Sequence, residues 1–178
     1  AAGALAELRP RFPRPEGARA ASPSSSALEL GLSFRSAARG GAVRPAQPLD
    51  AFPALRRLMA AAMWALEERN LSEQGLNVIC RRYMPGQGIP PHVDRCELFE
   101  EDVYGCVLQN TSDSALEFRE RAAASGVRSR VRVQELPGAC FRQRGDARYR
   151  WLHGVAPVSR GQRVSVTWRW FRPGRAGP

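Results

Sequence analysis

The segment Pro90-Pro91-His92-Val93-Asp94 places a histidine and an aspartate two residues apart, and His153 is the only other histidine in the chain. In an extended backbone, residues i and i+2 face the same side, so His92 and Asp94 can offer ligands to one ion. Two imidazoles and one carboxylate on one face of an octahedron suit Fe(II), because adjacent positions stay open for other ligands. The pattern predicts a non-haem iron site of His92, Asp94 and His153. The alternative is that both histidines have ordinary structural roles.

A second pattern lies downstream, where polar and apolar residues alternate as in a strand with one polar and one packing face. The polar face carries Arg163, Ser165, Thr167 and Arg169, and the packing face carries Val164, Val166, Trp168 and Trp170. Arginine pairs bidentately with carboxylates and keeps its charge when buried. The polar face therefore predicts a site for a small dicarboxylate, and the alternative is an edge strand with solvated arginines.

Three ordered blocks of the chain resemble the AlkB-like family of 2-oxoglutarate- and Fe(II)-dependent dioxygenases. The blocks are Arg82-Tyr83-Met84-Pro85-Gly86-Gln87-Gly88-Ile89-Pro90-Pro91-His92-Val93-Asp94, then Gly145-Asp146-Ala147-Arg148-Tyr149-Arg150-Trp151-Leu152-His153-Gly154-Val155, then the run from Arg163 to Arg169. The resemblance covers residues 76–172 well and residues 28–75 loosely. It implies a mainly β fold with a flanking helix, a double-stranded β-helix or jelly roll, in which iron and cosubstrate are held at one mouth.

The resemblance also implies roles for individual side chains. His92, Asp94 and His153 would ligate Fe(II), and the cosubstrates would be 2-oxoglutarate and O2. Arg163 would pair with the distal carboxylate of 2-oxoglutarate, and Arg169 would lie near the carboxylate that chelates the metal. Tyr83 occupies the position of the family's cosubstrate-binding tyrosine. Two residues before it the family usually has asparagine, and this chain has Arg81 instead.

The leading functional hypothesis is oxidative demethylation of alkylated nucleic-acid bases, with release of succinate, CO2 and formaldehyde. The alternatives are hydroxylation or demethylation of a modified tRNA base or of a protein side chain, and a non-catalytic metal-binding interaction module. Base-repairing members of the family place an acidic residue two positions after the ligand aspartate, where this chain has Cys96. We therefore assign Cys96, Tyr149 and Trp151 provisionally to substrate binding, and we expect Trp64, Trp168 and Trp170 in the core.

The formal net charge is +10, with 27 arginines and no lysine. From Arg142 to the C-terminus nine arginines accompany a single acid, Asp146, around the expected site. Such a surface suits the phosphates of RNA or DNA. A solvated arginine-rich face, or a coding bias toward arginine, is the alternative. The partners we expect are a nucleic acid or a protein substrate and no membrane, because no apolar run approaches membrane-spanning length. We expect a monomer.

The four cysteines, Cys80, Cys96, Cys106 and Cys140, show no Cys-x-x-Cys spacing, so neither a zinc ribbon nor a redox pair is indicated. We expect free thiols in a reducing intracellular compartment, the nucleus or the cytoplasm, with a disulfide as the alternative. An organelle remains another possibility, because the first residues are rich in arginine and serine and poor in acids.

Residues 1–27 show no apolar period and predict a disordered or low-complexity leader, followed by one catalytic domain at residues 28–172 and a tail at residues 173–178. Apolar residues at three- and four-residue spacing predict a helix from Asp50, its N-cap, to about Asn70, packed on the outside of the jelly roll. Strands are predicted at 28–34, 76–84, 103–109, 115–120, 127–135, 139–143, 149–157 and 163–171. Short strands at such intervals favour an antiparallel sandwich or barrel.

Overall fold

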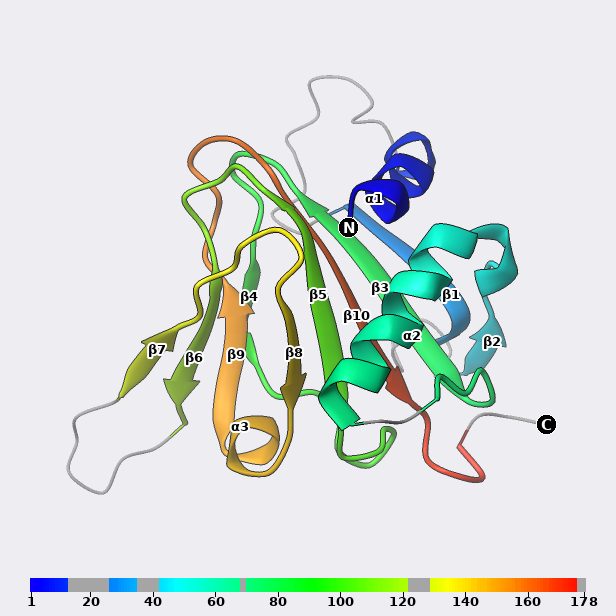
Figure 1. Ribbon diagram of the computed structural model, residues 1–178. Helices are drawn as coiled ribbons and strands as arrows, with labels where there is room; N and C mark the ends of the chain where they lie inside the picture. The colour runs from blue at the N-terminus through cyan, green and yellow to red at the C-terminus, as the bar shows by residue number, and fades with distance from the viewer. Residues whose placement is uncertain (13–25, 35–41, 68–69, 122–128, 176–178) are drawn as a thin grey trace.

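The computed structural model describes residues 1–12, 26–34, 42–67, 70–121 and 129–175. Two antiparallel sheets form the body of the molecule (Figure 1). The larger sheet has the order β2 (Val43–Pro45), β1 (Ser26–Phe34), β3 (Leu76–Tyr83), β10 (Arg163–Trp170), β5 (Val103–Asn110) and β8 (Cys140–Gln143). The smaller sheet has the order β4 (Ile89–His92), β9 (Trp151–Val155), β6 (Leu116–Glu120) and β7 (Arg130–Arg132). This arrangement confirms the predicted jelly roll.

The alternating strand β10 lies in the middle of the larger sheet, between β3 and β5, as Arg163↔Tyr83 and Trp168↔Tyr104 pairings show. Its apolar face is fully buried, with Trp168 at 0% and Trp170 at 4% exposure. Its polar face looks toward the smaller sheet. The predicted division of this strand into a packing face and a polar face is therefore confirmed, and so is the placement of both tryptophans in the core.

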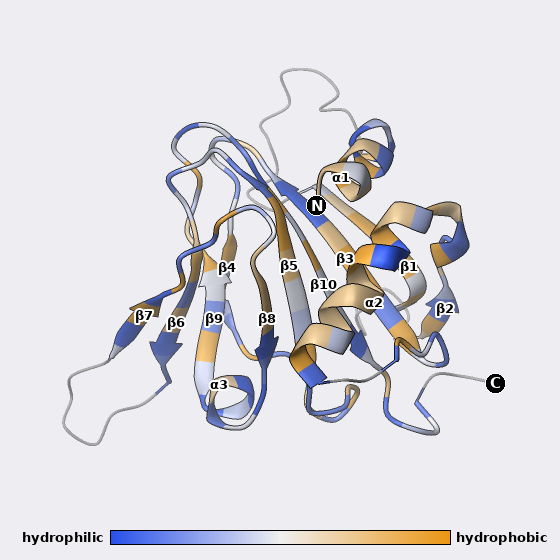
Figure 2. Ribbon diagram, in the orientation of Figure 1, coloured by the Kyte–Doolittle hydropathy of each residue, from blue (hydrophilic) through white to orange (hydrophobic). Residues whose placement is uncertain are grey.

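The main core lies between the outer face of the larger sheet and the helices α1 (Ala2–Leu8) and α2 (Pro53–Glu67). Hydrophobic residues run along α2, which crosses in front of β3, β10 and β5 (Figure 2). The buried residues of α2 are Leu55, Met59, Ala62 and Met63. Burial of such side chains stabilises a fold by about 1.5–3 kcal/mol each. The predicted packing of this helix on the outside of the sheet is confirmed, whereas Trp64, expected in the core, is 60% exposed.

The prediction of a disordered leader is wrong for the first twelve residues. They form α1 and the short 3-10 helix η1 (Arg9–Arg11), and Ala4, Leu8 and Phe12 are buried in the main core. These three residues are spaced by four positions, as on one face of a helix. The segment is too short for this period to be recognised beside the arginines and prolines that follow it. Residues 13–25 lie outside the described part of the chain.

The predicted N-cap of α2 is also wrong. Asp50 lies in the 3-10 helix η3 (Leu49–Ala51), and α2 begins at Pro53. The first backbone N–H groups of α2, those of Ala54 and Leu55, donate instead to the carboxylate of Glu7 at 2.8 and 3.0 Å. An acidic group at a helix N-terminus satisfies orphan donors and interacts favourably with the helix dipole. A side chain of helix α1 therefore caps the N-terminus of α2.

The strands appear where the sequence predicts them, with three differences. β2 and β4 were not predicted, and β7 is shorter than the predicted strand at 127–135. The chain at Asp146–Tyr149 forms the short helix α3, so the strand expected from residue 149 begins at Trp151. No helix in the described parts of the chain has the length and apolar character needed to span a bilayer.

Cys106 and Cys140 form a disulfide, so the expectation of free thiols is wrong for these two residues. The residues are direct partners in the pairing of β5 with β8, which brings their Cα atoms to 4.2 Å. Among the described residues, Cys80 and Cys96 are the free cysteines, and Cys80 is buried. Burial raises the pKa of the Cys80 thiol well above its usual value.

Candidate metal centre and adjoining cavities

The structure brings His92, Asp94 and His153 together, with one potential ligand atom from each lying within 4.8 Å of the others. His92 ends β4, His153 lies in β9, and the two residues are direct partners across these strands. Their ring centroids are 4.5 Å apart. Asp94 follows β4 and places its carboxylate Oδ1 3.6 Å from Nε2 of His92. Two imidazoles and one carboxylate in this arrangement are a donor set that fits a mononuclear Fe(II) site.

Gly154 is needed for the close approach of β4 to β9 next to His153. A Cβ atom at Gly154 would lie 2.7 Å from the carbonyl oxygen of Ile89 and 2.9 Å from the nitrogen of Pro91. Any larger residue would push β4 away from β9. Since the two histidines face each other across these strands, a glycine at this position keeps their side chains close together.

Hydrogen bonds orient both imidazole rings. Nδ1 of His92 lies 2.9 Å from the carbonyl oxygen of Pro90. When Nδ1 carries the proton and donates it to this carbonyl, the lone pair of Nε2, which lies near Asp94, is available to a metal ion. Nδ1 of His153 lies 3.2 Å from the side-chain amide of Gln143, which also donates to the carbonyl of Ala147. Partners of this kind fix the ring planes of metal-binding histidines.

The protonation states also favour a cation. Burial lowers the pKa of His153 to about 4, so this ring is neutral near pH 7. Burial opposes the charge of Asp94, but hydrogen bonds from His92 and the nearby Arg169 hold the pKa of its carboxyl well below the usual value. The hydrogen bond with Asp94 raises the pKa of His92. A bound metal ion would replace this proton as the partner of the carboxylate.

Arg169 of β10 supports the same carboxylate. It forms an ion pair with Asp94, its Nε donates to Oδ1 of Asn77 at 3.2 Å, and its guanidinium lies 4.0 Å from the ring centroid of Phe99. These three contacts fix both the guanidinium and the carboxylate that it pairs with. The resemblance implied that Arg169 lies near the cosubstrate carboxylate that chelates the metal, and the structure places Arg169 beside Asp94, one of the candidate ligands.

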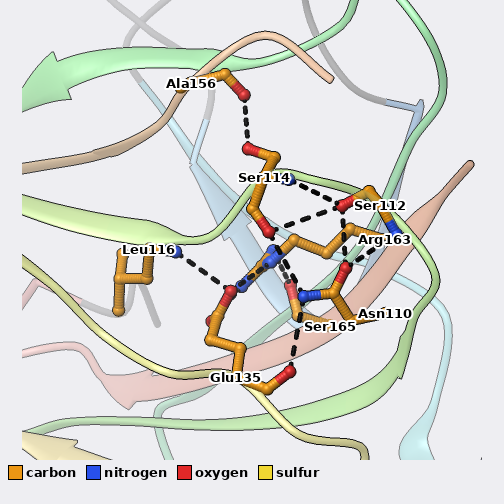
Figure 3. Close-up of polar contacts among 8 residues, drawn as sticks. All are labelled: Asn110, Ser112, Ser114, Leu116, Glu135, Ala156, Arg163 and Ser165. Carbon is orange, nitrogen blue, oxygen red and sulfur yellow. Dashed lines mark hydrogen bonds and ion pairs between the residues drawn. The ribbon is translucent and has the colours of Figure 1, made fainter. Parts of the chain in front are cut away.

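Arg163, at the other end of β10, is buried to 3% exposure and pairs with the equally buried Glu135 (Figure 3). Nε of Arg163 donates to Glu135 Oε2 at 2.7 Å, its Nη2 donates to Oε1, and its Nη1 donates to Oγ of Ser165 at 2.7 Å. The guanidinium carbon also lies 5.3 Å from the ring centroid of Tyr83. The two arginines predicted to share one dicarboxylate thus each have an acidic partner in the protein itself.

A cavity connects the triad with Arg163 between the two sheets. Its wall includes the predicted cosubstrate residues Tyr83, Arg163 and Arg169 together with His92, Asp94 and His153. Further wall residues come from both sheets, namely Ile79, Arg81, Ile89, Val103, Leu116, Phe141, Gln143, Val155, Ser165 and Thr167. The cavity therefore runs from a candidate metal centre to a buried arginine, as a chelating dicarboxylate would require.

Phe141 of β8 lines this cavity, and its ring lies against Gly105 of β5. A Cβ atom there would lie 2.4 Å from the ring of Phe141, which packs over the glycine from β8. The glycine therefore lets the Phe141 ring take this place in the cavity wall.

A second cavity lies beside His92 and Asp94. It is lined by Glu29, Phe34, Asn77, Ile79, Arg81, His92, Val93, Asp94, Arg95, Phe99 and Arg169. Arg95 lies over the ring of Phe34, with 5.1 Å between its guanidinium carbon and the ring centroid. Arg81, which stands where the family has asparagine, lines both cavities. The second cavity therefore combines aromatic rings and guanidinium groups beside the candidate metal ligands.

The three residues predicted to bind substrate, Cys96, Tyr149 and Trp151, do not line either of these cavities in the part of the chain that the structure describes. The Sγ atom of Cys96 donates to the carbonyl of Asp94 at 3.3 Å, which is a local turn contact. Tyr149 belongs to α3 and lies under Arg148, and Trp151 begins β9. The residues that take their place beside the triad are Phe34, Arg95 and Phe99.

Sequence reasoning missed Glu135, Gln143 and Arg148. Arg148 is fully buried, and its Nη1 donates to the backbone carbonyl of Asp94 at 2.9 Å, which holds the turn that carries the carboxylate. Glu135 is the only acid between Glu120 and Asp146 in an arginine-rich stretch, a signal of a paired carboxylate. Nothing in the sequence names its partner, which is 28 residues away.

Comparisons with known proteins agree with this geometry. No family model matches the chain. It is 33% identical over 92 residues to alkbh8 of Xenopus tropicalis, named a tRNA (carboxymethyluridine(34)-5-O)-methyltransferase, and 28% identical over 102 residues to an uncharacterized protein of Acanthamoeba polyphaga mimivirus. These matches cover 48% and 52% of the chain but only 14% and 46% of the two relatives. The chain thus spans less than half the length of either relative.

Two solved structures show the same fold at low sequence identity. A 2OG-Fe(II) oxygenase family oxidoreductase from Burkholderia pseudomallei has a TM-score of 0.61 at 14% identity, covering 97% of this chain and 78% of that one. A Pseudomonas putida prolyl-4-hydroxylase has a TM-score of 0.52 at 19% identity, covering 97% and 86%. The chain therefore has the jelly-roll fold of 2-oxoglutarate and Fe(II) oxygenases, and the match to alkbh8 confirms its resemblance to the AlkB-like family.

Proposed function

We propose that this chain, which resembles the AlkB-like family, is an Fe(II)- and 2-oxoglutarate-dependent dioxygenase that acts on a nucleic acid. The observation that carries the proposal is the joint placement of His92, Asp94 and His153 in the wall of a cavity that ends at Arg163. The donor set fits Fe(II), and the cavity fits a ligand that chelates a metal at one end and bears a carboxylate at the other.

The residues around the cavity would bind the metal, bind the cosubstrate or support the metal ligands. His92, Asp94 and His153 would hold Fe(II), which together with 2-oxoglutarate and O2 supplies the oxidation of a C–H bond with release of succinate and CO2. Arg163, Ser165 and Tyr83 would bind the distal end of the cosubstrate. Arg169 and Arg148 keep the Asp94 segment in place through its carboxylate and its backbone carbonyl.

The second cavity is the candidate substrate site because His92 and Asp94 of the triad also lie in its wall. Two of its guanidinium groups, those of Arg81 and Arg95, suit an anionic nucleic acid, and the half-buried Phe34 offers a ring for a planar group. Oxidation of a methyl group on a base nitrogen would give a hydroxymethyl group, which leaves as formaldehyde. Oxidation of a carbon-bound group would leave a stable alcohol.

A tRNA substrate is the second candidate. The relative alkbh8 is named for an activity on a tRNA uridine, and that name supports RNA over DNA for the matched segment. A protein side chain is the third candidate, since the fold is also that of a prolyl-4-hydroxylase.

The test is succinate production. The protein is loaded with Fe(II) without oxygen, mixed with 2-oxoglutarate and oxygen, and assayed with methylated DNA, methylated RNA or bulk tRNA. We expect one of the three to stimulate succinate release at least severalfold, and His92→Ala and His153→Ala to abolish that release. Asp146→Ala, which removes a carboxylate that is 73% exposed on α3, serves as the matched control and should retain activity.

If no nucleic acid stimulates succinate release from protein with verified iron content, the nucleic-acid proposal is wrong. Release that proceeds equally in wild type and both histidine variants would contradict the proposed metal site.

A further inference from the structure

Glu135 lies next to the cavity between the triad and Arg163, and no sequence pattern predicted its pairing with Arg163. It lies in the connection between β7 and β8 and its side chain is 1% exposed. Besides Arg163, its Oε2 accepts the backbone N–H of Leu116 at 3.0 Å, and its backbone carbonyl accepts from Nδ2 of Asn110 (Figure 3). A buried carboxylate is costly unless hydrogen bonds and a counter-charge satisfy it, and both are present here.

Glu135 lies behind Arg163 as seen from the cavity. Arg163, Ser165 and Leu116 belong to the cavity wall, whereas Glu135 does not. The carboxylate occupies the Nε–Nη2 edge of the guanidinium, and Ser165 takes one bond from Nη1. A guanidinium has more N–H groups than these three bonds use. After these three bonds, one N–H group of Nη1 and one of Nη2 remain, outside the Nε–Nη2 edge that Glu135 covers.

We propose that Glu135 is a positioning residue that fixes the guanidinium of Arg163 so that its Nη1–Nη2 edge receives the distal carboxylate of the cosubstrate. This inference rests on the proposed function and deepens it. A planar fork recognises a carboxylate only in a defined orientation, so a guanidinium that is held in advance loses less freedom on binding. The charge of Glu135 also balances Arg163 when the cavity holds no anion.

The surrounding loops hold Glu135 itself. Asn110, the last residue of β5, donates through Nδ2 to the backbone carbonyls of Glu135 and Ser114. The hydroxyl of Ser114 donates in turn to the carbonyl of Ala156 at 2.6 Å. These bonds join the ends of β5, β6 and β9 around one carboxylate (Figure 3). The orientation of Arg163 is therefore set by a rigid cluster that comes from several distant segments.

The decisive variant is Glu135→Gln, which keeps the size of the side chain and removes its charge. The measurement is calorimetric titration of the metal-loaded protein without oxygen, with 2-oxoglutarate and with 2-oxopentanoate, which has a methyl group in place of the distal carboxylate. We expect the Kd of 2-oxoglutarate to rise on the order of tenfold, as is typical when a supporting partner of a binding group is lost. The Kd of 2-oxopentanoate should stay unchanged, because that ligand does not use Arg163.

Glu117→Gln is the matched control. Glu117 is also a buried carboxylate, paired with Arg119 and Arg130, but it does not line the cavity. We expect its affinity for 2-oxoglutarate to equal that of the wild type. In Glu135→Gln, kcat at saturating 2-oxoglutarate should remain within about twofold of wild type, since the metal ligands are untouched.

An unchanged or lower Kd of 2-oxoglutarate in folded Glu135→Gln overturns the proposal, and so does an equal loss for both ligands. If Glu135→Gln does not fold, Glu135→Asp decides: its shorter side chain keeps the charge but cannot hold both nitrogens, so a wild-type Kd would overturn the proposal. A wild-type protein that binds metal but no 2-oxoglutarate would instead refute the proposed function.

Discussion

At the scale of single residues, the candidate site depends on two arginines, Arg163 and Arg169, that each have several partners. Arg169 pairs with Asp94 and stacks on Phe99, and Arg163 pairs with Glu135 while it lines the cavity. A guanidinium can do both because its edge donates hydrogen bonds while its face packs on a ring. A lysine at either position would keep the positive charge but could not make both the hydrogen bonds and the ring contact of a guanidinium.

Replacing Arg169 with lysine tests this statement. An ammonium group cannot hold Asp94 and Asn77 and also stack on Phe99, so the ligand carboxylate loses its fixed orientation. We expect metal affinity to fall by about 10- to 100-fold, measured by competition with a chelator in the absence of oxygen. Arg150→Lys is the control, because Arg150 is 76% exposed and its ion pair among the described residues is the surface pair with Asp146. Equal affinity in both variants would show that Arg169 does not support the metal site.

At the scale of elements, the helix pair α1 and α2 shows how a local pattern can be read correctly and its ends incorrectly. The apolar stripe of α2 predicts its packing face, because that face repeats every three to four residues. Its N-terminus is completed by Glu7, which is 47 residues away from Ala54. No local capping rule can find such a partner.

Glu7→Ala should lower the free energy of unfolding by about 1 kcal/mol, the usual cost of a lost helix cap. Chemical denaturation followed by circular dichroism measures it. Glu73→Ala is the control: its ion pair with Arg56 lies at the surface, where such pairs contribute little. A loss in Glu73→Ala as large as that in Glu7→Ala would argue against a capping role for Glu7.

At the scale of the whole molecule, the disulfide Cys106–Cys140 joins the edge strand β8 to β5 within the larger sheet. β8 also carries Phe141 and Gln143, which line the cavity between the triad and Arg163. The bond therefore secures one wall of the cavity to the core. This pairing replaces the expectation that all four thiols are free.

Labelling of the denatured, unreduced protein with a thiol reagent should modify two cysteines, Cys80 and Cys96, and prior reduction should raise the number to four. Mass spectrometry counts the labels. Reduction should also destabilise the fold, on the order of 3 kcal/mol for a loop of this size, which a lower thermal midpoint would report. Four labels without reduction would show that the thiols are free.

The sequence by itself determined the features that repeat over short distances. Period-two alternation predicted the strands and the two faces of β10, helical spacing predicted α2, and the His-x-Asp pattern identified two of the three residues that meet at the candidate metal centre. Only the tertiary structure decided the partners of these residues. Glu135 for Arg163, Glu7 for α2 and Cys140 for Cys106 are separated from them by 28, 47 and 34 residues. Such pairs are set by which strands and helices pack together, and packing depends on the whole chain, so no local pattern records them.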